Sequence, residues 1–233
     1  MLKPRILVVL TSNGSMGESG GPTGLWLEEL TTPYYVFAGG GAEVTLASIR
    51  GGPVPVDPRS VEDSEQPPTS VARFHADGRA GGSLDNSAPL AQFEARNFEA
   101  IFLPGGHGTM WDLPDDPRLA ALLSDAWRLG KVIGAVCHGP AGLVGAKDET
   151  GKPLVAGRRV TAFSNAGEKA VGLDKAVPFL LETRLAGLDA RYEAAAEPFA
   201  PHAITDGRLI TGQNPASAGP AAQLVLEALK SSA

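Results

Sequence analysis

The sequence lacks the features that several broad classes of protein require. Its 233 residues include one cysteine, so no disulfide can form within the chain and a disulfide-stapled secreted scaffold is excluded. No apolar stretch approaches the roughly 20 residues of a membrane span, and the run at residues 5–10 is too short for the core of a secretion signal. We therefore expect a cytoplasmic, reduced protein without a membrane partner.

Positive charge and aromatic residues are also scarce. The chain has 26 acidic against 20 basic residues, a net charge of −6, which argues against a nucleic acid or an anionic membrane as partner. Aromatic residues make up only 6%, whereas 29 glycines and 19 prolines indicate many tight turns. Because 43% of the residues are hydrophobic, the chain can bury a sizeable core, and we expect one domain over residues 1–233.

Short aliphatic runs alternate with amphipathic stretches along most of the chain. The patterns predict strands at residues 6–10, 43–48, 100–103, 131–136 and 159–163, helices at 25–38, 119–129, 168–171, 177–186 and 220–229, and a hairpin at 203–211. This alternation predicts an α/β fold with a mainly parallel sheet covered on both faces. Residues 50–88 are rich in glycine, proline and polar residues, and this loop-rich excursion is typical of a lid, a partner surface or a flexible loop.

The single cysteine, Cys137, directly follows the fourth predicted strand. In an open parallel sheet, active sites form at the carboxyl ends of the strands. Small residues stand two positions before and two after it, at Ala135 and Gly139, as the sharp strand-to-helix turn of a nucleophile elbow requires. The start of the next helix would favour the thiolate. Cys137 is therefore a candidate nucleophile, with a small buried hydrophobic side chain as the alternative.

Two further features accompany this cysteine. His138 follows directly, and as a base it would need an acid from elsewhere in the fold; the alternative is a structural or surface histidine. The third predicted strand ends in the segment 104–108, with sequence PGGHG. Its glycines can bring backbone N–H groups against a developing oxyanion, although paired glycines after a strand are also typical of a simple turn.

Six stretches, in order along nearly the whole chain, carry a family resemblance. They are residues 24–33, 47–57, 104–112, 135–140, 161–165 and 209–217, with sequences GLWLEELTTP, ASIRGGPVPVD, PGGHGTMWD, AVCHGP, TAFSN and LITGQNPAS. With them the sequence resembles the Parkinsonism-associated/PfpI superfamily of the class I glutamine-amidotransferase-like fold, most closely its heat-shock chaperone and glyoxalase III branch. The resemblance implies a flavodoxin-like three-layer sandwich with Cys137 as nucleophile on the elbow.

The resemblance also implies a glutamate from the first helix that hydrogen-bonds the cysteine. The spacing from Gly24 and to Pro33 assigns this role to Glu29 rather than to its neighbour Glu28. A carboxyl group beside a thiolate should be protonated, because like charges repel and burial raises a carboxyl pKa. Glu29 could then act as a proton shuttle. The pattern alone would equally fit a solvated carboxylate on the helix face.

A third side chain is implied for the base. In this branch the histidine after the nucleophile is oriented by an acid in the loop after the next strand, and Glu168 is the best match. The motif commonly carries paired acids at this point, whereas this chain has Glu168 followed by Lys169. The alternative for Glu168 is a glutamate at a helix N-terminus, favoured by the helix dipole.

The activity implied by the resemblance is that of a cofactor-free, glutathione-independent glyoxalase, a lyase of the D-lactate dehydratase class that converts methylglyoxal to lactate. The Cys137 thiolate would attack the aldehyde, and Glu29 with His138 would move a proton between adjacent carbons. Backbone N–H groups near Gly106 and His138 would stabilise the oxyanion. Only four histidines exist, without a close ligand cluster beyond the elbow, so we expect no metal.

The resemblance leaves other functions open. A stress-induced holdase chaperone would bind unfolded proteins through an exposed apolar patch, and the cysteine would be dispensable. Protein deglycase, amidase or peptidase activity could use the same cysteine. Glutamine amidotransfer is disfavoured, because the chain contains no His-x-Glu motif. Members of the superfamily commonly pair, so we expect a homodimer.

Overall fold

A computed structural model describes residues 3–61 and 67–231 of the chain. In this part of the chain the core is a seven-stranded sheet with the order β3-β2-β1-β4-β5-β9-β8, in which only β8 runs antiparallel to its neighbour. The strands are β1 (Arg5–Leu10), β2 (Glu43–Ser48), β3 (Ala88–Pro89), β4 (Ala100–Leu103), β5 (Val132–Val136), β8 (Ala203–Asp206) and β9 (Leu209–Gly212). The predicted mainly parallel sheet is confirmed.

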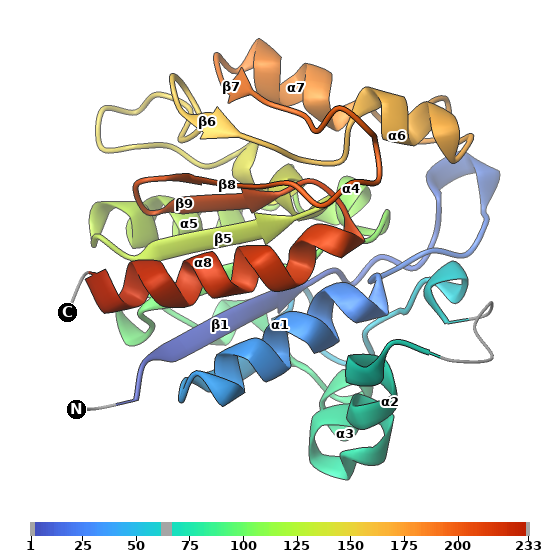
Figure 1. Ribbon diagram of the computed structural model, residues 1–233, viewed down its shortest axis with the longest axis vertical. Helices are drawn as coiled ribbons and strands as arrows, with labels where there is room; N and C mark the ends of the chain where they lie inside the picture. The colour runs from blue at the N-terminus through green and yellow to red at the C-terminus, as the bar shows by residue number, and fades with distance from the viewer. Residues whose placement is uncertain (1–2, 62–66, 232–233) are drawn as a thin grey trace.

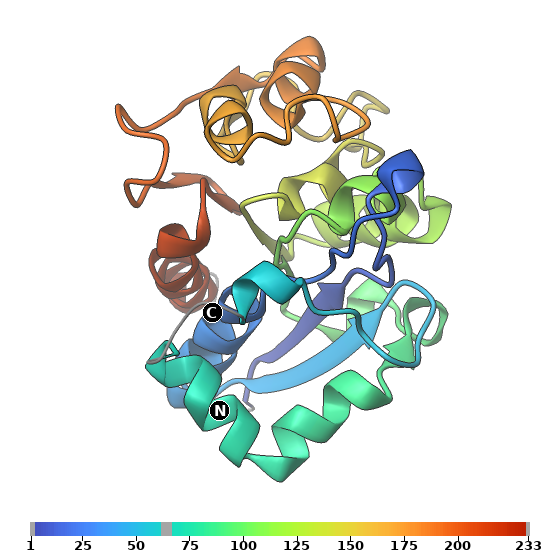
Figure 2. The same ribbon diagram turned by 90° about the vertical axis from the view of Figure 1, so that its right-hand side faces the viewer.

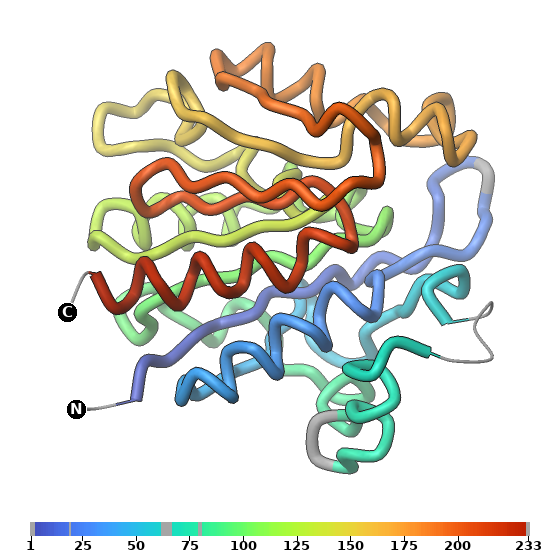
Figure 3. The backbone as a smooth tube through the Cα atoms, in the orientation of Figure 1, coloured from blue at the N-terminus to red at the C-terminus, as the bar shows by residue number. Residues whose placement is uncertain are grey.

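Helices cover both faces of the sheet. They are α1 (Leu27–Gly39), α2 (Thr69–Ala76), α3 (Gly78–Asp85), α4 (Thr109–Asp112), α5 (Pro117–Arg128), α6 (Asn165–Ala170), α7 (Leu181–Gly187) and α8 (Ala218–Ser231). Helices α1 and α8 pack against each other in front of the sheet, and α5 lies behind it (Figure 1). The tube in Figure 3 shows the same three layers, with the blue α1 beside the red α8. None of the helices in the described ranges is long and apolar enough to cross a bilayer.

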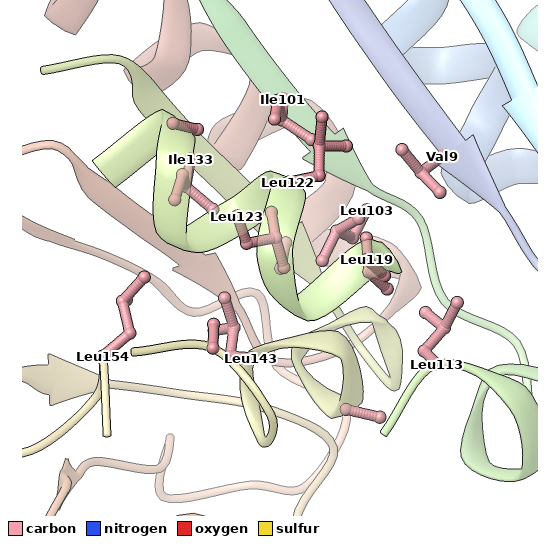
Figure 4. Close-up of a cluster of buried hydrophobic side chains, with 14 of the residues drawn as sticks. Val9, Ile101, Leu103, Leu113, Leu119, Leu122, Leu123, Ile133, Leu143 and Leu154 are labelled. Carbon is pink, nitrogen blue, oxygen red and sulfur yellow. The ribbon is translucent and has the colours of Figure 1, made fainter. Parts of the chain in front are cut away.

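The central strands are buried on both faces, as their continuous aliphatic sequences predict. Successive side chains point to opposite faces, so each strand contributes to two clusters. Val9, Ile101 and Ile133 belong to the cluster under α5, with Leu119 and Leu123 of that helix (Figure 4). The intervening residues of the same strands belong to the cluster under α1 and α8. The sheet is therefore packed between two apolar layers, and the residues at the carboxyl ends of its strands are held in place by this packing.

The excursion at residues 50–88 is more ordered than the sequence indicates. It contains α2 and α3, and α2 packs against α1 with the ring of Phe74 against that of Tyr34. The prediction of a segment with little regular structure is wrong for residues 69–85. These helices have eight residues each, and only Val71 and Phe74 of α2 are buried, so their apolar periodicity is too short to recognise.

The segment predicted as a fifth strand, 159–163, does not join the main sheet. Only β6 (Arg159–Val160) is a strand, and it pairs with β7 (Arg191–Tyr192) in a separate two-stranded sheet. The edge of β5 that it would occupy is taken by β9. Figure 2 shows this small sheet gathered with α6 and α7 at one end of the molecule, and α2 with α3 at the other.

Candidate active site

Cys137 lies on a sharp turn between β5 and the 3₁₀ helix η5 (Gly139–Leu143). Its φ of 58° is in the left-handed region, where a non-glycine residue is strained. The Cys137 N–H donates to the Gly212 carbonyl at 2.8 Å, and its carbonyl accepts from the Phe163 N–H at 2.8 Å. A Cβ on Gly139 would lie 2.1 Å from the Leu103 carbonyl oxygen, so this position needs glycine. The fold thus includes the predicted elbow.

Glu29 approaches the cysteine from the first turn of α1. Its side chain is fully buried, and Oε2 accepts a hydrogen bond from the Gly105 N–H at 2.8 Å. Oε1 has no hydrogen-bond partner in the described structure, and the Cys137 thiol is the neighbouring side chain that lowers the pKa of this carboxyl, against the effect of burial. Burial raises the pKa of Glu29 to about 8, so the carboxyl is protonated at neutral pH. The neighbouring Glu28 is only half-buried.

The thiol of Cys137 is 4% exposed. Burial raises the pKa of the Cys137 thiol, whereas the backbone N–H groups of Gly106 and His138 donate to the sulfur and lower it. The expectation of a thiolate favoured by a helix start is therefore wrong. The element that follows is a 3₁₀ helix of five residues, and its weak dipole cannot offset the loss of solvent. A base must take the thiol proton.

His138 is placed to be that base. Its Nδ1 lies 3.3 Å from Cys137 Sγ, and its Nε2 lies 3.0 Å from Glu168 Oε1. Cys137 and His138 can face each other although they are adjacent, because the backbone of the elbow is irregular. The His138 imidazole packs against the Phe163 ring, with the two centroids 4.5 Å apart. Burial lowers the pKa of His138 to about 4. The imidazole is neutral, and since its Nε2 faces a carboxylate, the Nδ1 lone pair faces the thiol.

Glu168 enters from the first turn of α6, whose N-cap Ser164 accepts from the Gly167 N–H. The Glu168 side chain is 2% exposed. Burial alone would raise its pKa, but hydrogen bonds from His107 and His138 outweigh burial and hold the pKa at about 2. Glu168 is therefore an anion, and its Oε2 is buried without a partner.

The fold adds two side chains that the sequence did not single out. His107 Nε2 lies 2.9 Å from Glu168 Oε1, and its ring centroid is 4.0 Å from that of His138. Arg59 approaches the other side of His107, with one guanidinium nitrogen 3.3 Å from Nδ1. His107 lies in the glycine-rich segment after β4, where the sequence drew attention only to backbone N–H groups. A histidine at the carboxyl end of the strand next to β5 is the signal that could have found it.

The four predicted side chains thus come together from the elbow after β5 and from helices α1 and α6. The structure brings Cys137, His138, Glu29 and Glu168 into one cluster, and it aims the N–H groups of Gly106 and His138 at the sulfur. The end of the family stretch at residues 209–217 is tied to a neighbouring loop. The Asn214 side chain donates to the carbonyls of Pro198 and Ala200, and so holds a loop whose Phe199 ring lies 6.4 Å from that of Phe163.

One group of possible metal ligands falls within this cluster. Single ligand atoms of His107, His138 and Glu168 lie within 4.8 Å of one another. A cation there would need the Nε2 lone pair of both imidazoles. Arg59 has only donors, so His107 Nδ1 accepts from it and the ring hydrogen of His107 is on Nε2. The donor set therefore fits a hydrogen-bonded network better than a metal centre.

Comparison with known proteins gives consistent similarities. The model of the DJ-1/PfpI family matches residues 24–228. Glutathione-independent glyoxalase HSP31 of Saccharomyces cerevisiae is 32% identical over 99% of this chain and 100% of its own length. The crystal structure of glyoxalase III from Candida albicans matches with a TM-score of 0.88 and 29% identity, covering 97% of both chains. Rapid Encystment Protein 24 KDa of Francisella tularensis matches with a TM-score of 0.92 and 39% identity, covering 98% of this chain and 99% of its own.

Proposed function

The chain belongs to the DJ-1/PfpI family, and from this premise we propose that it is a cofactor-free, glutathione-independent glyoxalase that converts methylglyoxal to lactate, with Cys137 as nucleophile. Relatives named as glutathione-independent glyoxalases align over almost the full chain. The observation that carries the proposal is the position of Cys137 between a protonated carboxyl, Glu29, and a neutral base, His138, at 3.3 Å. An internal redox reaction of a dicarbonyl needs these two groups to move protons, without any external hydride carrier.

The first step is addition of the thiol to the aldehyde. Sulfur bonds to the aldehyde carbon while His138 Nδ1 takes the thiol proton, and the oxyanion is stabilised by the N–H groups of Gly106 and His138. The His138 imidazolium then returns the proton to the oxyanion, which gives a neutral hemithioacetal. The Glu168 carboxylate at 3.0 Å stabilises the transient imidazolium.

The second step moves hydrogen between the two carbons. His138 removes the hydrogen of the former aldehyde carbon while Glu29 gives its proton to the neighbouring ketone oxygen, forming an enediol. His138 then protonates the second carbon, and Glu29 recovers a proton from the first hydroxyl, leaving a thioester. Water, deprotonated by His138, hydrolyses the thioester to lactate and the free thiol. Each electron pair stays within the substrate, so no oxidant or reductant is consumed.

Methylglyoxal consumption without glutathione tests the proposal. Wild type should consume methylglyoxal and form lactate, and Cys137→Ala should lose this activity. The matched control is Glu227→Gln, on the exposed side of α8, which should leave turnover unchanged. Lack of consumption by the folded wild type would reject the function, and full activity of Cys137→Ala would reject the nucleophile.

The chaperone, deglycase, amidase, peptidase and homodimer hypotheses stay predictions. A holdase needs a continuous apolar surface. Among the described residues the large exposed hydrophobic side chains are Val61, Leu129, Val171 and Phe199, from four separate segments. Suppression of protein aggregation by Cys137→Ala would support the chaperone hypothesis. Sedimentation at micromolar concentration would show whether the protein is a dimer. The cytoplasmic location stays an expectation from the sequence.

A further inference from the structure

One carboxylate oxygen in the site serves two imidazoles. Glu168 Oε1 lies 2.9 Å from His107 Nε2 and 3.0 Å from His138 Nε2, whereas Oε2 has no partner. Both histidines are buried, with 5% and 1% of their surface exposed. Because the Glu168 carboxylate is an acceptor only, each imidazole donates its Nε2 hydrogen to the same atom.

The tautomer of His107 is fixed from its other side. A guanidinium has no acceptor, so Arg59 must donate to the Nδ1 lone pair of His107 at 3.3 Å. A proton on Nδ1 would face this cation, so the ring hydrogen of His107 lies on Nε2. Arg59 is itself held by hydrogen bonds of 2.6 and 2.9 Å to the buried Asp57, which accepts from the Thr23 hydroxyl at 2.9 Å. The excursion thus reaches the site through η2 (Pro58–Ser60) and its N-cap Asp57.

Sharing the oxygen weakens what Glu168 can do for His138. A carboxylate oxygen that already accepts one N–H stabilises a second imidazolium less, because part of its charge is compensated. The hydrogen bond from His107 therefore reduces the negative charge that Glu168 Oε1 offers to His138, and Arg59 keeps the His107 ring hydrogen on the nitrogen that makes this bond. Burial and both of these neighbours lower the pKa of His138, against the opposing effect of Glu168.

We propose that His107 is a positioning residue of this site: by occupying Glu168 Oε1 it keeps His138 an unprotonated base for Cys137 into the acid range. The inference rests on the proposed function for its catalytic meaning, but it concerns a property of Cys137 that can be measured without that reaction. The titratable and charged groups around His138 in the described structure are Cys137 and Glu29 on one side and Glu168, His107, Arg59 and Asp57 on the other.

The test is the pH dependence of Cys137 alkylation by iodoacetamide, from pH 5 to 8, in His107→Phe. Phenylalanine keeps the ring stacked on His138 but removes the hydrogen bond to Glu168. We expect the wild-type rate to change little with pH between 5 and 7. In His107→Phe, the pKa of His138 should rise from about 4 although burial still lowers it, so that the rate at pH 5 falls to a fraction of the rate at pH 7. The kcat for methylglyoxal in His107→Phe should fall over the same acidic pH range.

Two further variants make the test decisive. His107→Gln offers an N–H to Glu168, so it should restore the wild-type profile, which a merely structural role of the ring would not predict. His75→Phe, on the exposed side of α2, is the matched substitution away from the site and should leave the profile unchanged. Identical profiles for His107→Phe and wild type, or an acid limb in His107→Gln equal to that of His107→Phe, would overturn the proposal. An enzyme inactive toward methylglyoxal that still shows the alkylation shift would reject only the proposed function.

Discussion

Two buried glutamates flank the same cysteine and its base, yet they are in opposite charge states. Glu29 and Glu168 expose 0% and 2% of their surface, so burial penalises both anions. The pKa of Glu29 is raised to about 8, whereas that of Glu168 is lowered to about 2. The difference lies in the donors: one backbone N–H reaches Glu29, but two imidazole N–H groups reach a single oxygen of Glu168. The number of donors, rather than burial, decides which carboxyl holds a proton.

This difference divides the site into an acid side and a base side. On the side of α1, a protonated carboxyl can give a proton to the substrate and recover it. On the side of α6, an anion orients His138 and stabilises it when it becomes a cation. Substitutions that make the two glutamates alike should therefore damage catalysis in different ways, and the following predictions separate these effects.

The largest effect is expected from Glu168→Gln. An amide carries no charge to stabilise the His138 imidazolium and does not fix the tautomer, and such a change in a catalytic triad lowers turnover about 10⁴-fold. Methylglyoxal turnover and the iodoacetamide rate should both fall, because His138 no longer deprotonates Cys137 efficiently. Glu227→Gln is the matched control. An unchanged alkylation rate in Glu168→Gln would show that Glu168 does not act through His138.

Glu29→Gln should separate turnover from thiol reactivity. Glutamine keeps the shape and a donor but cannot exchange a proton, so turnover should fall by about 10²–10⁴, the usual contribution of general acid–base catalysis. Alkylation of Cys137 should stay within about threefold of wild type, because the base side is intact. Glu28→Gln is the control, since the next helix position points about 100° away. Loss of turnover in Glu28→Gln alone would mean that the register of α1 at the site is wrong.

The same two substitutions should change stability with opposite signs. The pKa of Glu29 is raised in the folded state, which favours folding below pH 4.5, and this advantage is lost as the pH rises toward 8. Because glutamine does not ionise, Glu29→Gln should raise the free energy of unfolding by up to about 3 kcal/mol at pH 7. A lowered pKa stabilises above pH 4.5 and is lost as the pH falls toward 2, so Glu168→Gln should lower that free energy by about 3 kcal/mol at pH 7.

Urea unfolding of both variants and wild type at pH 7 and pH 5 measures these changes. The gain for Glu29→Gln should fall to about 1 kcal/mol at pH 5, because most of the ionisation penalty of Glu29 is absent there. A destabilised Glu29→Gln protein at pH 7 would contradict the assignment of a protonated carboxyl.

The smallest effect concerns the alkaline limb of turnover in wild type. Glu29 loses its proton near pH 8, so kcat should halve near that pH and reach about one tenth of its plateau value at pH 9. Glu28→Gln should retain this limb unchanged. A profile flat to pH 9 would remove Glu29 as the proton donor, whatever its effect on stability.

The sequence predicted the fold where apolar runs are long and regular. Strands β1, β4 and β5, the β8–β9 hairpin and helices α1, α5 and α8 were expected close to their observed bounds. It failed at α2 and α3, whose eight residues give too few apolar positions, and at residues 159–163, because strand pairing depends on which edge of β5 is free.

The sequence by itself determined where the candidate nucleophile lies. A cysteine between a buried strand and the small residues Ala135 and Gly139 is a local pattern, and the family motifs added Glu29, His138 and Glu168. Sequence motifs do not specify the protonation states of these side chains. The sequence-based expectation of a thiolate was wrong, since the pKa of Cys137 depends on how completely the fold removes solvent from it.

Only the tertiary structure decided which groups of the site are charged and which are neutral. Glu29 is bonded to Gly105, 76 residues away, and Glu168 to His107, 61 residues away, while Arg59 reaches His107 from an excursion that had no expected part in the site. Desolvation and donor geometry set these charges, and both arise between segments that only folding brings together. The physical reason is the distance along the chain. The steric requirements of the elbow involve a few consecutive residues, whereas the electrostatic interactions join residues that are far apart in the sequence.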